Sequence, residues 1–193
     1  MKKLVKSAIH TYWLEKLRSE ANLLPSLTYF KTGYLGLSKC HPIFRVCGSS
    51  PWEIEKACVQ MRLLSGRYQF EALTKHWSSH EGLCLLPSCS HPSAMHEGNI
   101  ESFFVSCYSL NPAREKFKLF FSSYLTEFPF LSSLTDEFLA LNSIKFYLDP
   151  STMPPVISMV QEYGEEVLYH LFKITRNYCF LLHELRNKLL ANS

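Results

Sequence analysis

Three cysteines in the middle of the chain, Cys84, Cys89 and Cys107, have the side chains and the spacing of metal ligands. Zinc takes about four nitrogen or sulfur ligands in a tetrahedron, and a loop followed by a helix end can supply them. Histidines lie on both sides of the first two cysteines: His76, His80, His91 and His96. The pattern predicts a zinc site. The alternative is that the thiols are buried as small apolar side chains.

The patterns that mark common catalytic sites are absent from the sequence. There is no Gly-x-Ser-x-Gly nucleophile elbow, no glycine-rich phosphate loop and no pair of aspartates suited to a two-metal centre. Asp149 precedes a proline, and Asp136-Glu137 falls in the first turn of an expected helix, where the helix dipole favours acidic residues. The sequence therefore predicts a protein that is not an enzyme, with no catalytic residues and no small-molecule substrate.

Basic residues are concentrated in the first quarter of the chain. The net charge is +3, but residues 1–45 carry eight Lys or Arg against two Glu. A basic segment favours contact with phosphates or another anionic surface, and a solvated helix face is the alternative. The side chains predicted to contact nucleic-acid phosphates are Lys2, Lys3, Lys6, Lys16, Arg18 and Arg67.

The cysteine count and the hydropathy pattern indicate an intracellular protein, nuclear or cytoplasmic. Seven scattered cysteines, an odd number, argue against a disulfide framework and for a reducing compartment. The apolar run after Met1 is broken by Lys6 and His10, which is unlike a secretory signal. No stretch has the length and apolarity of a membrane span, so no membrane partner is expected.

Apolar residues recur at helical spacing through most of the 193 residues, of which 47% are apolar. This periodicity predicts helices over 2–21, 51–64, 68–78, 99–107, 111–128, 135–147 and 155–190, the last with a break at Gly164. We find no alternating pattern typical of strands. Residues 155–190 are the most apolar segment and are expected to present a broad buried face.

The helix that begins after Ser50 has the clearest start signal. Ser50-Pro51-Trp52-Glu53 is a capping box, in which the Ser50 hydroxyl accepts from the amide of residue 53 and Glu53 reaches back to the amide of Ser50. The predicted buried stripe of this helix is Ile54, Cys58, Met61 and Leu64–Ser65. The next helix is expected to turn Phe70, Leu73 and Trp77 inward.

These elements predict an all-α fold: an irregular multi-helix domain with a central Cys/His-rich loop. We divide the chain into an N-terminal helical segment (1–78), a Cys/His-rich knuckle-like segment (79–110) and a C-terminal helical segment (111–193). The knuckle-like segment is where we expect the metal.

Several motifs together carry a resemblance to a known family. They are, in chain order, Tyr12-Trp13-Leu14-Glu15-Lys16-Leu17-Arg18, Pro51-Trp52-Glu53, Gln60-Met61-Arg62-Leu63-Leu64-Ser65-Gly66-Arg67-Tyr68, His76-Trp77-Ser78, Gly82-Leu83-Cys84, Cys89, Glu101-Ser102, Cys107, Arg114 and Phe146-Tyr147-Leu148-Asp149-Pro150. In this order they resemble the C-terminal tail of reverse transcriptase polyproteins from animal non-LTR retrotransposons. The match extends over nearly the whole chain.

The resemblance implies a Cys-Cys-His-Cys zinc knuckle with a trailing arginine, but the sequence departs from it at one ligand. Where the family has histidine, this chain has Ser102, and serine is a poor zinc ligand. Either the knuckle has lost its metal, or His96, His91 or His80 replaces the missing ligand. Our predicted set is Cys84, Cys89, Cys107 and His96: a degenerate zinc knuckle.

The family's catalytic aspartates and its endonuclease pattern are absent from this sequence. The resemblance therefore implies a tail that has been truncated or is separately encoded. We expect a non-catalytic accessory segment that binds RNA or DNA, with a reverse transcriptase core as a second expected partner. The alternatives are a structural helical protein-interaction module, motivated by the apolar residues 155–190, and a non-functional retrotransposon remnant.

Overall fold

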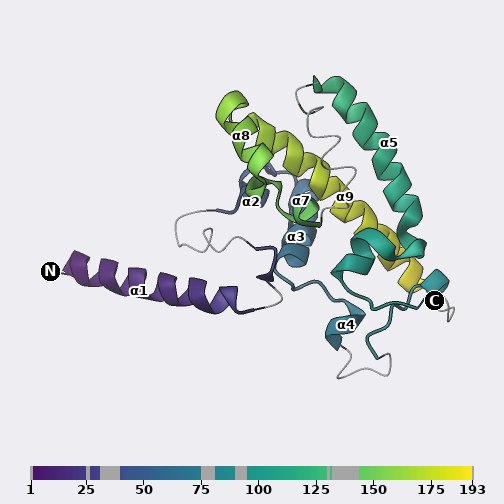
Figure 1. Ribbon diagram of the computed structural model, residues 1–193, viewed down its shortest axis with the longest axis horizontal. Coiled ribbons are helices and arrows are strands. Elements are labelled where there is room, and N and C mark those ends of the chain that lie inside the picture. Colours follow the sequence, from purple (N-terminus) through teal and green to yellow (C-terminus); the bar gives the residue numbers. More distant parts are fainter. Residues whose placement is uncertain are drawn as a thin grey trace.

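The computed structural model describes residues 2–24, 27–30, 40–74, 81–89, 95–129, 131 and 144–192. This part of the chain is all-α, as predicted: its elements are helices, and it has no strand beyond an isolated bridge between Leu83 and Glu97 (Figure 1). None of its helices combines the length and the apolarity that crossing a membrane requires.

The helices follow the predicted order. They are α1 (Lys2–Asn22), α2 (Pro42–Arg45), α3 (Pro51–Leu64), α4 (Glu71–Thr74), α5 (Asn111–Glu127), α7 (Ile144–Leu148), α8 (Pro154–Tyr163) and α9 (Glu166–Ala191). Short 3₁₀ or π turns join them: η3 (Pro87–Cys89), η5 (Ser102–Ser106), η6 (Tyr108–Leu110) and η8 (Pro150–Thr152). The predicted break at Gly164 is confirmed, with a φ of 82° that favours glycine.

Two predicted helices are only partly within the described residues. Within the range 68–78, Tyr68–Phe70 is non-helical and α4 is helical. Residues 75–80, which include Trp77, lie outside the described residues. Of the helix predicted over 135–147, only α7 is described. Leu73, expected to point inward, is 49% exposed.

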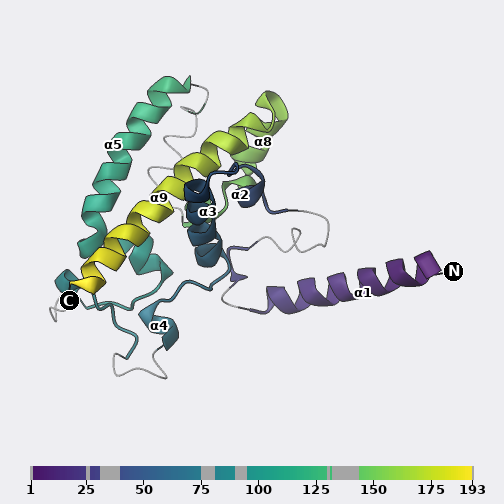
Figure 2. The same cartoon turned by 180° about the vertical axis from the view of Figure 1, so that it is seen from behind.

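The long helix α9 forms the centre of the structure, and α3, α5, α7 and α8 pack around it (Figures 1 and 2). Its predicted apolar face is confirmed as core. The buried members of that face are Val167, Leu171, Ile174, Tyr178 and Leu182. Neighbouring helices of the same chain cover this face, whereas Ile157, Tyr163 and Tyr169 of the same segment are exposed.

Buried polar groups join the core helices. The Gln60 amide donates to the carbonyls of Tyr147 (2.8 Å) and Leu148 (3.2 Å) and contacts the Thr175 hydroxyl (2.9 Å), which links α3, α7 and α9. Arg176, which is 1% exposed, donates to the Ile43 carbonyl. These hydrogen bonds offset part of the cost of burying the two side chains. Among the described residues, the Gln60 Oε1 and Arg176 Nε atoms are buried without a hydrogen-bond partner.

The details predicted for α3 were wrong in two respects. Ser50 is the N-cap and Pro51 follows it, but the Ser50 side chain makes no capping hydrogen bond. The Glu53 carboxylate contacts Lys56 (2.7 Å) and Arg176 (3.2 Å) instead of turning back. The buried stripe is also shifted, because α3 turns a different face to α9: Ala57, Val59, Gln60, Leu63 and Leu64 are buried, whereas Ile54 is exposed.

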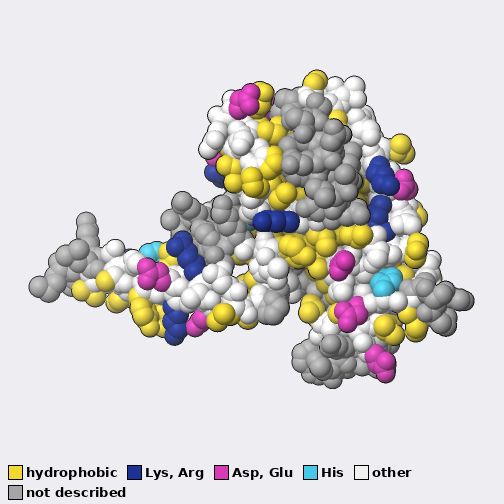
Figure 3. Space-filling view, in the orientation of Figure 1, with side chains coloured by type: hydrophobic (Ala, Val, Ile, Leu, Met, Phe, Trp, Pro, Cys, Tyr) yellow, Lys and Arg dark blue, Asp and Glu magenta, His cyan; other side chains and the backbone are white. Residues whose placement is uncertain are grey.

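Helix α1 projects away from the other helices (Figures 1 and 2). Its helical periodicity was predicted correctly, yet Val5, Ile9, Trp13 and Leu17 are each at least half exposed. Figure 3 shows hydrophobic side chains interspersed with basic ones along the helix. Helix α1 therefore carries a stripe of exposed apolar surface.

Candidate metal centre

The four predicted ligands, Cys84, Cys89, His96 and Cys107, come together in the structure. Their ligand atoms all lie within 4.8 Å of one another, and the Cys89 and Cys107 Sγ atoms are 3.4 Å apart. In a tetrahedral site with Zn–S bonds of about 2.3 Å, two sulfurs are separated by about 3.8 Å. The group therefore has the donor types and the separation of a site that could hold a metal ion.

Cys84 and His96 meet because their segments run antiparallel. Leu83 and Glu97 form the isolated bridge, the Cys84 amide donates to the His96 carbonyl (2.9 Å), and the Gly98 amide donates to the Gly82 carbonyl (2.9 Å). Backbone hydrogen bonds thus bring residues that are far apart in the loop next to each other.

The other two thiols are placed by short helical turns. Cys89 ends η3, and its amide donates to the Leu86 carbonyl (2.9 Å). Cys107 ends the π-helical turn η5, with its amide bonded to the Ser102 carbonyl (2.9 Å). The Ser109 hydroxyl accepts from the Ser88 amide (3.1 Å), which ties η3 to η6 and brings the two thiols together.

Arg114, the trailing arginine of the sequence motif, holds the turn before Cys107. Its Nη1 atom donates to the Cys107 carbonyl (2.7 Å), its Nε atom to the Phe104 carbonyl (2.9 Å), and its Nη2 atom to the carbonyls of Ser102 and Phe103 (both 3.1 Å). One guanidinium thus donates to four backbone carbonyls in and just after this turn, using the fork of N–H donors that arginine provides. Arg114 positions a ligand without being one.

Hydrogen bonds among the thiols, together with burial, shift the pKa of each of the three cysteines. A hydrogen bond from Cys84 lowers the pKa of Cys107 and raises the pKa of Cys84, and burial raises the pKa of Cys89. Backbone N–H groups of Leu86 and Ser109 donate to the sulfurs of Cys84 and Cys107 and favour their thiolate forms. Thiolate is the form that binds a metal.

Little of this site is open to solvent. Cys89 and Cys107 are buried, Cys84 is partly buried, and His96 is of intermediate exposure. Four protein donors with limited solvent access are typical of structural zinc sites, whereas catalytic sites keep one position open.

Ser102 has a different role from that of a ligand. Its hydroxyl donates to the Asn99 carbonyl (2.9 Å), and its amide donates to the Asn99 side chain (3.0 Å). These reciprocal bonds cap the start of the helical turn that leads to Cys107. His96, three residues before Asn99, supplies the nitrogen donor of the cluster, while the predicted alternatives His80 and His91 lie outside the described residues.

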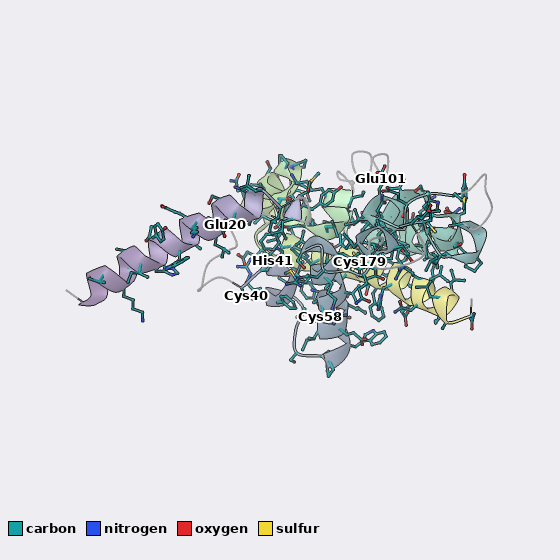
Figure 4. The ribbon with its side chains drawn as sticks, turned by 90° about the horizontal axis from the view of Figure 1, so that it is seen from below. Glu20, Cys40, His41, Cys58, Glu101 and Cys179 are labelled. Carbon is teal, nitrogen blue, oxygen red and sulfur yellow. The ribbon has the colours of Figure 1, made fainter. Side chains whose placement is uncertain are left out.

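The remaining described cysteines come from other elements. Cys40 precedes α2, Cys58 is in α3, and Cys179 is in α9 (Figure 4). The fourth, Cys47, is buried after α2, where its thiol donates to the Phe44 carbonyl (3.1 Å). Cys179 is fully buried, and burial raises the pKa of its thiol. A buried thiol of this kind fits the apolar role that is the alternative to metal binding.

The predicted nucleic-acid contacts are dispersed. Lys6, Lys16 and Arg18 lie along α1, where Lys16 is 4.0 Å from the Glu20 carboxylate, whereas Arg67 lies in the turn after α3. The side chains of Lys2 and Lys3 lie outside the described part of the chain. The structure therefore does not gather these residues at the cysteine cluster. Sequence reasoning missed Arg62 and Arg186, which line the same cavity as Arg67.

Protein-family models, curated proteins and solved structures contain no match to this chain.

Proposed function

We propose that this protein is a non-catalytic, zinc-stabilised helical domain that associates with nucleic acid. The gathering of three thiols and one imidazole within 4.8 Å supports the zinc part of the proposal. Thiolate-rich tetrahedral sets select zinc among the common divalent metals, although iron–sulfur clusters also use thiolates. The resemblance to the tail of non-LTR retrotransposon reverse transcriptases suggests the nucleic-acid part.

Zinc bound here would act as a structural cross-link. Cys84 and His96 hold the two sides of the antiparallel loop, and Cys89 and Cys107 hold the turns η3 and η5. Together they would fix the chain around the cluster against η6 and α5. Because these segments have few regular elements of their own, a structural metal would supply a large part of their stability.

Zinc content of the purified chain tests this function. About one zinc per chain is expected, with loss in Cys84→Ser and retention in Cys40→Ser, the matched control at an exposed thiol. His96→Ala, compared with His91→Ala and His80→Ala, identifies the nitrogen ligand. A folded wild-type protein without zinc would contradict the proposal and favour the alternative of a decayed retrotransposon remnant.

Nucleic-acid association is proposed to rest on basic side chains. Among the described residues, Lys6, Arg18 and Arg67 have no carboxylate within ion-pair distance. We expect binding of a fluorescent RNA or DNA to weaken steeply with salt, because phosphate contacts release counterions. Affinity that does not change with salt would contradict this part of the proposal and leave the zinc part intact.

A second candidate function, protein interaction, is favoured by the exposed apolar side chains of α1. Four of them recur at helical spacing, and Trp13 is 57% exposed. Such a stripe is suited to packing on another helical surface, for which the resemblance suggests a reverse transcriptase core. Self-association that is abolished by Ile9→Lys and Trp13→Lys would support this candidate, and a monomer in light scattering would count against it.

A further inference from the structure

A second concave site lies away from the cysteine cluster, where the end of α3 meets the last turns of α9. The cavity has a volume of about 290 Å³. Its lining includes Arg62, Arg67, Tyr68, His183, Arg186 and Asn187. Three of these side chains carry guanidinium groups, and they come from three different places: the last turn of α3, the turn after it, and α9.

The positive charge of this cavity is only partly neutralised by the protein. Arg186 is 2.7 Å from the Glu71 carboxylate and lies over the Tyr68 ring, so its position is fixed. Arg62 and Arg67 are exposed, and no described carboxylate lies within ion-pair distance of either. The guanidiniums of Arg62 and Arg67 therefore line the cavity without an ion-pair partner among the described residues, whereas the guanidinium of Arg186 is held in place by Glu71.

The neutral groups of the pocket are ordered as well. The ring nitrogens of His183 lie 2.9 Å from the Tyr68 hydroxyl and 3.0 Å from the Asn187 amide nitrogen. Burial, followed by the charges of Arg186 and Arg62, lowers the pKa of His183, so the imidazole is neutral near pH 7. Glu55 and Glu184 act in the opposite direction and raise the pKa of His183, but burial and the two arginines outweigh them.

We infer that this cavity binds a phosphate group, held by the guanidiniums of Arg62 and Arg67, with Arg186 behind them. Guanidinium groups match phosphate because their N–H donors pair with two oxygens at once. The volume is close to the lower limit of small-ligand pockets, about 300 Å³, and leaves room for more than the phosphate itself. Both a free nucleotide and a nucleic-acid strand carry a phosphate group. Binding of a nucleic-acid strand rests on the proposed function, whereas binding of a free nucleotide does not.

The experiment compares two probes on the full-length chain. Arg62→Gln/Arg67→Gln removes the two unpaired charges. The control, Arg45→Gln/Lys118→Gln, removes two basic charges from pairs with Glu165 and Glu115, outside the pocket. Inorganic phosphate is followed through the His183 ring resonances in NMR spectra. A short fluorescent single-stranded oligonucleotide is followed by anisotropy over a range of salt concentrations.

Phosphate is expected to shift the His183 resonances in wild type and in the control, and not in the pocket variant. The plot of log affinity against log salt for the oligonucleotide should become shallower by about 0.7 for each phosphate that the variant no longer neutralises. Phosphate shifts without oligonucleotide binding would support the pocket as a site for a free phosphate compound and contradict the nucleic-acid function. Unchanged His183 resonances in wild type, or equally weakened binding in pocket variant and control, would overturn the inference.

Discussion

The Cys/His segment from Glu81 to Leu110 and the helices around α9 are ordered by different interactions. In the core, the buried faces of α3, α5 and α7 pack on α9, and apolar burial stabilises that arrangement without a ligand. The described part of the Cys/His segment contributes Phe103, Phe104 and Leu110 to the same core, but it consists of short turns and one bridge. These are also held by backbone hydrogen bonds, Arg114 and four potential metal ligands. The difference indicates that a metal should matter to one region and hardly to the other.

The two regions are nevertheless in contact through η5. The Phe104 ring stacks on Tyr147 with the centroids 5.8 Å apart, and the Tyr178 hydroxyl donates to the Phe104 carbonyl (3.3 Å). Phe103 and Phe104 are both buried. Loss of the proposed metal should therefore disturb the turn that leads to Cys107, while the helices beneath it remain folded.

Removal of the proposed zinc is expected to have a larger effect on stability than any single core substitution. Structural zinc contributes about 10 kcal/mol or more in isolated zinc fingers. A chelator should abolish hydrogen-exchange protection of the Cys84 and Gly98 amides, which flank the loop bridge, and leave that of α9 residues such as Ile174 nearly unchanged. Equal loss of protection in both regions would show that our division between them is wrong.

Phe172→Ala should produce the largest destabilisation among the core substitutions. Phe172 is fully buried in α9, and truncating a buried phenylalanine costs about 3–5 kcal/mol because a cavity remains. Urea unfolding measures the change, with Leu119→Ala on α5, where the side chain is 76% exposed, as the control. The variant should still bind zinc, and a loss of zinc while the chain stays folded would contradict the independence of the two regions.

Gln60→Leu should destabilise the core by about 1–3 kcal/mol, because the carbonyls of Tyr147 and Leu148 lose a buried donor. The matched change at an exposed glutamine of α8, Gln161→Leu, should be close to neutral. The free energy of unfolding in urea separates the two. If both variants have the same stability, the amide of Gln60 is not an important link between the helices.

Glu53→Gln should lower the free energy of unfolding least, by roughly 1 kcal/mol at neutral pH. The Glu53 carboxylate is partly exposed in its pairs with Lys56 and Arg176, and the glutamine amide keeps an acceptor oxygen. Burial raises the pKa of Glu53, but Lys56 and Arg176 outweigh it and hold the pKa below its ordinary value of 4.5. The ionised carboxylate therefore stabilises the fold above that value, and this contribution is lost as the pH falls through the lowered pKa.

Unfolding of wild type and Glu53→Gln as a function of pH checks this last expectation. The difference should be constant near pH 7 and shrink in acid. Ser50→Ala is the companion variant, because the Ser50 hydroxyl makes no capping bond and its loss should be nearly neutral. If the stability difference between wild type and Glu53→Gln grows in acid, the pKa of Glu53 is raised and not lowered. If Ser50→Ala is clearly destabilising, the Ser50 hydroxyl does cap the helix.

The sequence by itself determined the long helices and the donors of the candidate metal site. Helical hydrogen bonds are local, so the apolar period, Pro51 and Gly164 were sufficient to predict the main helices and their ends. Cys84, Cys89 and Cys107 were identifiable for a similar reason, since thiols are few and their spacing is visible in the chain.

Only the tertiary structure decided which of these features meet. The bridge between Leu83 and Glu97 placed His96 beside the thiols, a pairing that no local pattern encodes. The same is true of the cavity that joins Arg62 to Arg186, and of α1, whose apolar stripe remains exposed although its period is that of a buried helix. Contacts between residues distant in sequence depend on how whole helices pack, because packing and not periodicity selects the face that each helix buries.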